Sequence, residues 1–136
     1  MRCPYVKTTN VYVLWRNHIL LIKRSATDTN LPNFWESPGG HVDLKVHLSD
    51  NIVARKEAVR EVFEESGLAL NPAKLQLYSI NPSSCHIAYI YDFDSKVPPK
   101  ITLSFEHSKF CWKNCNFLLK NLRREVKSFI LKELCR

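Results

Sequence analysis

Short apolar runs separated by polar segments dominate the first third of the chain. Residues 11–15 and 19–23 are largely apolar and are divided by three polar positions, which predicts a hairpin of two buried β-strands. Residues 25–33 are polar and contain Pro32, so they predict a loop. Residues 34–37 predict a short strand leading into Pro38-Gly39-Gly40, a tight turn where the backbone can approach another group closely.

The pattern becomes helical near residue 50. Ser49 or Asp50 is a candidate N-cap for a helix that runs to about Ser66, and Gly67 is its expected C-terminal stop. Beyond this helix, residues 75–80 and 86–93 predict two strands joined by a polar turn. Residues 97–100 predict a loop, and residues 109–113 predict a last strand.

Apolar residues recur at spacings of three and four near the end of the chain, which predicts an amphipathic C-terminal helix. Strands with one helix in the middle and one at the end describe an α+β or layered α/β domain. The length of 136 residues suits a single domain over residues 1–136. The apolar positions of the predicted terminal helix are Leu118, Leu119, Leu122, Val126, Phe129, Ile130 and Leu134.

The composition is that of an ordinary globular protein, with 45% apolar and 24% charged residues. No apolar run approaches the roughly 20 residues that span a bilayer, and the first residues lack the apolar core of a secretory signal. We therefore expect no membrane partner. The five cysteines form no paired framework, which favours reduced thiols and a cytoplasmic location.

The net charge of +7 changes the expected partners. A strongly basic chain favours anionic partners, among which we expect a small nucleotide first and RNA second. The basic residues near the C-terminus are interpreted as a solvated helix face. The sequence leaves open whether the protein is a monomer or a homodimer.

Four glutamates cluster on the middle helix. At about 100° per residue, Glu57, Glu61, Glu64 and Glu65 fall within an arc of about 100°. Like charges at such spacings repel by a few tenths of a kcal/mol per pair. A hard divalent cation such as Mg²⁺, which prefers oxygen ligands, is the simplest reason to gather them. The alternative is an ordinary acidic helix face, and Arg60 is expected to project to another side.

Two features favour a cation over a solvated face. Gly39-Gly40 precedes the helix, and a glycine turn can present a bare backbone carbonyl to a metal ion. Gly67 ends the helix and leaves Glu64 and Glu65 in its last turn, where the helix dipole disfavours negative charge. Two glutamates kept at this end of the helix despite that cost indicate that they have a functional role.

The segment from Gly40 to Leu68 resembles the box of the Nudix hydrolase family, whose pattern is G-x5-E-x7-R-E-U-x-E-E-x-G-U, with U a bulky aliphatic residue. The resemblance implies a MutT-like Nudix fold, in which a mixed β-sheet is sandwiched between helices. The second half of the pattern fits at every specified position: Arg60, Glu61, Val62, Glu64, Glu65, Gly67 and Leu68.

The first half of the box departs from the pattern. Arg60 follows Gly40 by 20 positions where the pattern has 14, so six residues are extra. Val46 and Ile52 occupy the two positions where the first glutamate would stand. The family uses that glutamate mainly to support the site. Asp43 and Asp50 are the nearest acidic substitutes, and Asp43 is a candidate partner for Arg60.

The resemblance implies metal-dependent hydrolysis of a nucleoside diphosphate-linked substrate, first of all a nucleoside triphosphate to monophosphate and pyrophosphate. The cofactor would be Mg²⁺, with Mn²⁺ as a substitute. Glu61 or Glu106 would be the base, and Arg60 would orient Glu61. Arg24 would contact phosphate, and Trp35, Phe34 or Tyr89 would stack on the base. The implied metal-binding residues are Gly40, Glu61, Glu64 and Glu65.

Two other functions compete with this hypothesis. The charge favours a Nudix enzyme that removes a 5′ cap or pyrophosphate from RNA. The missing first glutamate favours a Nudix-fold nucleotide-binding regulatory module with weak activity.

Overall fold

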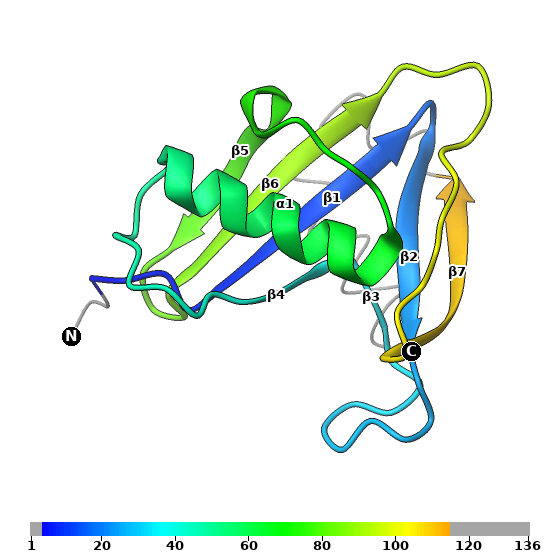
Figure 1. Ribbon diagram of the computed structural model, residues 1–136, viewed down its shortest axis with the longest axis horizontal. Coiled ribbons are helices and arrows are strands. Elements are labelled where there is room, and N and C mark those ends of the chain that lie inside the picture. The colour runs from blue at the N-terminus through cyan, green and yellow to red at the C-terminus, as the bar shows by residue number, and fades with distance from the viewer. Residues whose placement is uncertain (1–3, 115–136) are drawn as a thin grey trace.

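The computed structural model of the protein describes residues 4–114. Within this range, seven strands form one mixed sheet, and one α-helix lies across it (Figure 1). The helix is α1 (Ile52–Ser66), followed by the short 3-10 helix η1 (Pro72–Lys74); the strands are β1 (Thr8–Trp15), β2 (His18–Arg24), β3 (Trp35–Glu36), β4 (Gly39–His41), β5 (Gln76–Asn81), β6 (His86–Phe93) and β7 (His107–Asn114).

The strands are ordered β3-β2-β1-β6-β5, with β4 added to β1 and β7 added to β2. β1 and β6 run parallel, and the other pairs are antiparallel. β1 pairs with β2 only beside the hairpin turn, at Leu14–Ile19 and Trp15–His18, and its N-terminal half pairs with β4 instead. β1 and β2 therefore separate away from the hairpin turn, where the chain passes from β3 to β4 next to α1 (Figure 1).

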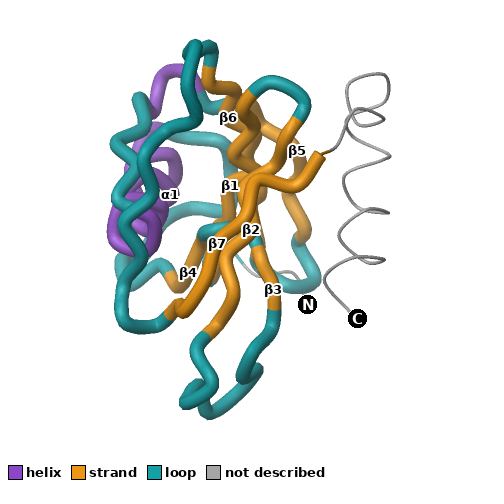
Figure 2. The backbone as a smooth tube through the Cα atoms, turned by 90° about the vertical axis from the view of Figure 1, so that its right-hand side faces the viewer, coloured by secondary structure: helices purple, strands orange, loops and turns teal. Residues whose placement is uncertain are grey.

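Helix α1 covers one face of the sheet, as the side view shows (Figure 2). Its apolar side contributes Ala54, Ala58 and Val62, all fully buried, to the main core cluster. Strand residues such as Val11 and Ile22 face them, because alternate side chains of a strand lie on the same face. A smaller apolar cluster occupies the opposite face: Leu14, Ile19, Leu21 and Ile90.

Most of the predicted elements are confirmed. The hairpin, the strand before the glycine pair, the helix ending at Ser66 and the three later strands all form, and the sheet is mixed, giving an α+β fold. Gly67 ends the helix with a left-handed backbone (φ 74°), as its position predicts. The predicted C-terminal helix lies outside the described residues.

The prediction of a turn at Pro38-Gly39-Gly40 is wrong. Gly39 and Gly40 instead begin β4, which pairs with β1. A Cβ atom at Gly39 would lie 2.7 Å from the Cα of Asn10, so only glycine permits this pairing distance. The close backbone approach expected from the glycine is therefore real, but the neighbour is another strand.

The helix N-cap is neither Ser49 nor Asp50. Asn51 caps α1, because its Oδ1 accepts a hydrogen bond of 2.9 Å from the backbone N–H of Ala54. Asp50 instead pairs with Arg55, with 2.8 Å between Oδ1 and Nε. The helix thus begins later than predicted, and the six extra residues lie in the loop before it.

We expect Asn51→Ala to lower the free energy of unfolding by about 1 kcal/mol, because it removes a side-chain cap. The Asn51 amide also donates to the carbonyls of His47 and Ser49, so the preceding loop should loosen with it. Urea unfolding followed by circular dichroism measures the change. Asn51→Asp, which keeps the accepting oxygen, should retain most of the stability; an equal loss in both variants would contradict the capping role.

Two observations bear on the expected location. No helix among residues 4–114 has the length and apolar character needed to cross a membrane. Cys85 is disulfide-bonded, whereas Cys111 is a free thiol. The expectation of reduced thiols is therefore wrong for Cys85.

Candidate functional site

A polar cleft of about 410 Å³ lies between the C-terminal half of α1, strand β4 and the segments that precede β3 and β7. Its volume is within the range of small-molecule sites. The structure brings Glu106 to the same cleft as the helix carboxylates, although 41 residues separate it from Glu65 in the sequence. Five glutamates line the cleft: Glu36, Glu61, Glu64, Glu65 and Glu106.

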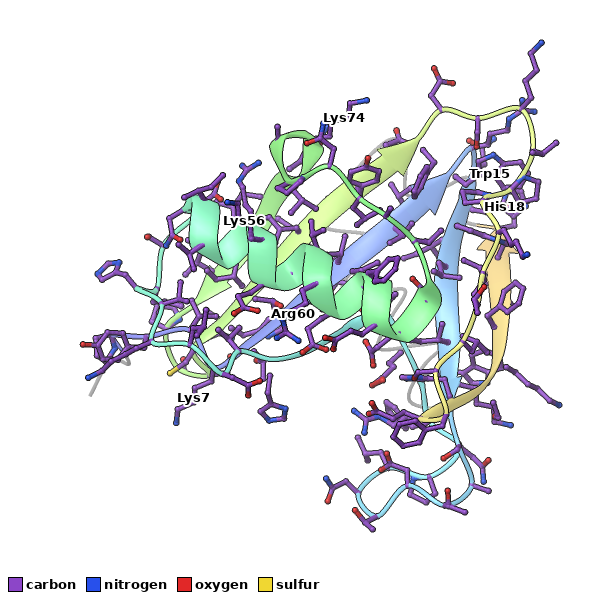
Figure 3. The ribbon with its side chains drawn as sticks, viewed as in Figure 1. Lys7, Trp15, His18, Lys56, Arg60 and Lys74 are labelled. Atoms are coloured by element: carbon purple, nitrogen blue, oxygen red, sulfur yellow. The ribbon has the colours of Figure 1, made fainter. Side chains whose placement is uncertain are left out.

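Arg60 binds three carboxylates of its own helix. Its Nε lies 2.7 Å from Glu57, its Nη1 2.8 Å from Glu64 and its Nη2 3.1 Å from Glu61. It projects from the side of α1 that faces β4 (Figure 3), so the expectation that it points to another side is wrong. The three carboxylates raise the pKa of the guanidinium, above all through the hydrogen bond that Arg60 donates to Glu57.

Glu61 packs against the backbone of Gly40. A Cβ atom at Gly40 would lie 2.6 Å from the Glu61 carboxylate carbon, so the missing side chain is what makes room for this carboxylate. Burial raises the pKa of Glu61, and the neighbouring charges of Glu64 and Glu106 add to the rise, while Arg60 opposes it.

Glu65 is the most deeply buried carboxylate of the cleft, with a side chain 8% exposed. Its Oε1 accepts a hydrogen bond of 2.6 Å from the backbone N–H of Gly39, which ties the helix to β4. Burial raises the pKa of Glu65 to about 8, helped by the charges of Glu36, Glu61 and Glu106 and opposed by the Gly39 hydrogen bond. Gathering negative charge in this way is costly without a counter-cation.

His107 closes the inner end of the cleft. Its Nε2 lies 3.0 Å from Glu36 and 3.6 Å from Glu65, and the three groups are close enough to hold one metal ion. Its Nδ1 is buried without a hydrogen-bond partner among the described residues. A histidine that binds a metal ordinarily donates its other N–H to an acceptor, so this arrangement suits a hydrogen bond from Nε2–H to Glu36 better than a nitrogen–metal bond.

Arg24 lines the cleft, as its predicted role requires, but it is already paired. Its Nε donates to Glu36 over 2.8 Å and its Nη1 to Asp28 over 3.2 Å. Sequence reasoning missed Glu36 and His107; their place beside the glycine pair and Glu106 was the available signal.

The aromatic residues predicted to stack on a base do not line the acidic cleft. Trp35 lies on the opposite side of the sheet, in a separate hollow with Leu21 and Cys111, because it alternates with Glu36 along β3. Phe34 packs against the smaller apolar cluster, and Tyr89 is fully buried with its hydroxyl donating to Asp50.

The extra residues of the box form a loop that supplies no counterpart of its first glutamate. Val46 is 4% exposed and belongs to the main core, whereas Ile52 is 62% exposed on the first turn of α1. Asp43 lines the cleft, but among the described residues the ion pairs of Arg60 are those with glutamates of α1. The proposed Asp43–Arg60 pair is therefore not formed.

This arrangement is chemically suited to a hard divalent cation that also binds phosphate. Carboxylate oxygens from one helix and a bare backbone at Gly40 converge on the same space, and oxygen is the donor that Mg²⁺ and Mn²⁺ prefer. Such a cation neutralises phosphate charge and positions the reacting groups for transfer.

Comparisons with known proteins give a consistent picture. The NUDIX domain family matches residues 4–132 of the chain. The MutT protein of Methanosarcina mazei Go1 has a similar structure, with a TM-score of 0.61, 22% identity and coverage of 97% of both chains. At that identity the likeness concerns the fold.

Part of the chain is also similar to the m7GpppN-mRNA hydrolase NUDT17. Identity is 39% over 57 residues for Danio rerio and 44% over 52 residues for Homo sapiens, which is 42% and 38% of this chain. The matched segments span 17% and 14% of the length of those two relatives.

Proposed function

The chain belongs to the NUDIX domain family, and on that premise we propose that it hydrolyses nucleoside triphosphates to nucleoside monophosphates and pyrophosphate. As a Nudix protein it is placed among hydrolases that act on pyrophosphate bonds. The observation that supports the reaction is the convergence of Glu61, Glu64, Glu65 and Glu106 with Gly40 in one cleft. Water adds to a phosphorus of the substrate and gives up a proton to a carboxylate base. The bond from that phosphorus to the oxygen between the α- and β-phosphates breaks, which separates the monophosphate from pyrophosphate.

The proposed metal-binding residues are Glu61, Glu64, Glu65 and the backbone carbonyl of Gly40. Their oxygen donors fit Mg²⁺ or Mn²⁺, which, when bound, would neutralise the phosphates and lower the pKa of coordinated water. Glu64 is half-exposed and Glu65 buried, so the set reaches from the mouth of the cleft to its floor.

Glu61 and Glu106 are the candidate bases. Both lie in the cleft, and each lies close enough to raise the pKa of neighbouring carboxylates. A general base must accept the proton of the attacking water within hydrogen-bond reach. We favour Glu61, because Gly40 and Arg60 hold its carboxylate on both sides.

Metal binding should weaken as the pH falls below about 8, the pKa of Glu65. Below that pH the carboxyl carries a proton that a metal ion must displace, so the apparent affinity for Mn²⁺ should fall by about tenfold per pH unit. Calorimetric titration of the protein at about pH 6, 7, 8 and 9 measures this. Glu65→Gln should flatten the profile; an unchanged slope in that variant would assign the proton to another group.

A direct test of the proposed reaction uses ¹⁸O-labelled water. The protein is incubated with each common nucleoside triphosphate and Mg²⁺, and the products are weighed by mass spectrometry. We expect monophosphate and pyrophosphate, with one labelled oxygen in one of them. Release of inorganic phosphate in place of pyrophosphate, or no turnover with either Mg²⁺ or Mn²⁺, would count against the proposal.

A capped or 5′-triphosphorylated RNA is the second candidate substrate. The partial likeness to m7GpppN-mRNA hydrolases and the net charge of +7 favour it. RNA as the natural substrate predicts turnover of a capped oligonucleotide whose KM rises steeply with salt, since basic side chains would displace counterions from the strand. Equal KM values at low and moderate salt would remove this candidate.

The remaining proposals concern the setting of the protein. A single domain, a monomer or homodimer, and a cytoplasmic location are proposed from the sequence alone.

A further inference from the structure

Glu57 is a buried carboxylate outside the part of the box that the family pattern specifies. The residue is 6% exposed and lies one helical turn before Arg60. A buried charge is tolerated only where it is paired and hydrogen-bonded. The partner is the guanidinium of Arg60, whose Nε donates to Glu57 Oε2 over 2.7 Å.

This hydrogen bond fixes the direction in which Arg60 points. A guanidinium is planar, so when Nε is held, the two outer nitrogens have one orientation left to them. In that orientation Nη1 meets Glu64 and Nη2 meets Glu61. Both are proposed metal-binding residues. Glu57 therefore reaches the cleft through Arg60 without lining it.

The pair also sets the charge of the cleft. Glu57 and Arg60 cancel each other, which leaves the charges of the three remaining helix glutamates for a cation. Without the Glu57 charge, the positive charge of Arg60 would be balanced by Glu61 and Glu64 alone. Arg60 would then weaken the attraction of these two carboxylates for a divalent cation, because its guanidinium lies about 3 Å from both of them and charges at that distance interact strongly.

The departure of this chain from the family pattern gives the pair its significance. The first glutamate of the box is missing, since the two positions where it would stand are Val46 and Ile52. The structure also brings no carboxylate from the loop of residues 42–50 to Arg60. Asp50 is bound to Arg55 instead. Among the described residues, Glu57 is the carboxylate that holds Arg60 from outside the proposed metal set.

We propose that Glu57 is a positioning residue of this site, supporting Arg60 from within the helix and thereby raising the affinity of the cleft for divalent cations. The support that the family places before the helix is thus moved into α1. The inference rests on the proposed metal-dependent function, and its test measures metal binding without substrate.

The test is a double-mutant cycle on Mn²⁺ affinity, measured by calorimetry at about pH 8. Glu57→Gln should weaken Mn²⁺ binding by about 10-fold, the lower end of the effect of removing the partner of a metal ligand, because Glu57 acts on the ligands through Arg60. In an Arg60→Gln background the same change should cause no further loss, because Glu57 acts through Arg60. Raising Mn²⁺ should restore most of the rate of Glu57→Gln. Asp94→Asn, which removes a carboxylate outside the cleft, is the matched control and should bind normally.

Unchanged Mn²⁺ affinity in Glu57→Gln, or an equal loss with and without Arg60, would overturn the inference. Either result would leave the proposed function standing if the protein still turns over nucleotides with metal. If wild-type protein binds no Mn²⁺, the inference and the proposed function both fail. Should Glu57→Gln not fold, Glu57→Asp serves instead, because its shorter side chain withdraws the carboxylate from Nε of Arg60. A loss of Mn²⁺ affinity that disappears in the Arg60→Gln background supports the inference, and unchanged affinity or an equal loss in both backgrounds overturns it.

Discussion

Replacing Glu61 by glutamine is expected to lower kcat by about 10²–10⁴-fold, the range found when a general base is removed. The amide keeps the shape of the side chain but carries no negative charge and cannot accept the proton of the attacking water. It also removes one of the proposed metal-binding oxygens. The fold should survive, because burial and neighbouring carboxylates already raise the pKa of Glu61 and make its ionised form unfavourable without metal.

A loss of rate with unchanged or higher melting temperature is therefore the signature of this change. It is measured by initial rates at saturating Mg²⁺ alongside thermal unfolding of the metal-free protein. Glu106→Gln is the matched variant, because Glu106 is the other candidate base and lines the same cleft. A larger loss for Glu106→Gln than for Glu61→Gln would transfer the role of base to Glu106.

The second large effect is expected from Gly40→Ala. The added Cβ atom would lie 2.6 Å from the Glu61 carboxylate carbon, closer than atoms in contact can be. The carboxylate must shift, since the end of a side chain moves more easily than two paired strands. A displacement of this size at a reacting group costs about 10²-fold in rate. Affinity for Mn²⁺ should fall in parallel.

Gly67→Ala separates this local effect from a general loss of fold. Gly67 ends α1 with φ 74°, where an alanine is strained, and its nearest neighbour would be Thr102 rather than a carboxylate. We expect that variant to lose about 1–2 kcal/mol of stability and much less activity than Gly40→Ala. Comparable rates for the two variants would contradict the explanation given for Gly40.

The sequence predicts the elements well where the pattern is local. The apolar runs that became β1, β2 and β6 are visible without a structure, because side-chain alternation and run length determine them. The end of α1 at Gly67 is equally local, since only a residue tolerant of a left-handed backbone fits there.

The start of α1 was missed because three consecutive residues can each cap a helix. Ser49, Asp50 and Asn51 are all favoured at N-caps, and tertiary contacts decide among them. Asp50 instead forms an ion pair with Arg55 and accepts a hydrogen bond from the hydroxyl of Tyr89, a strand residue far along the chain. Periodicity carries no information about such a contact.

The residues of the candidate site likewise fall into those that the sequence places together and those that only the sheet topology brings together. Glu61, Glu64 and Glu65 share a helix, so their proximity follows from helical geometry alone. The positions of Glu36, Glu106 and His107 depend on how β2, β3 and β7 meet, which is a matter of sheet topology. The direction of Arg60 was misjudged because helical angle places the Cα atom, whereas a long side chain bends toward the carboxylates that bind it.

The most direct test of the central claim is pyrophosphate release from a panel of nucleoside triphosphates, measured for wild-type protein and Glu61→Gln side by side with Mg²⁺. We predict that wild-type protein releases pyrophosphate from at least one nucleotide, that chelation of the metal abolishes release, and that Glu61→Gln is slower by about 10²–10⁴-fold. Metal-independent release, or equal rates for the two proteins, would contradict the account.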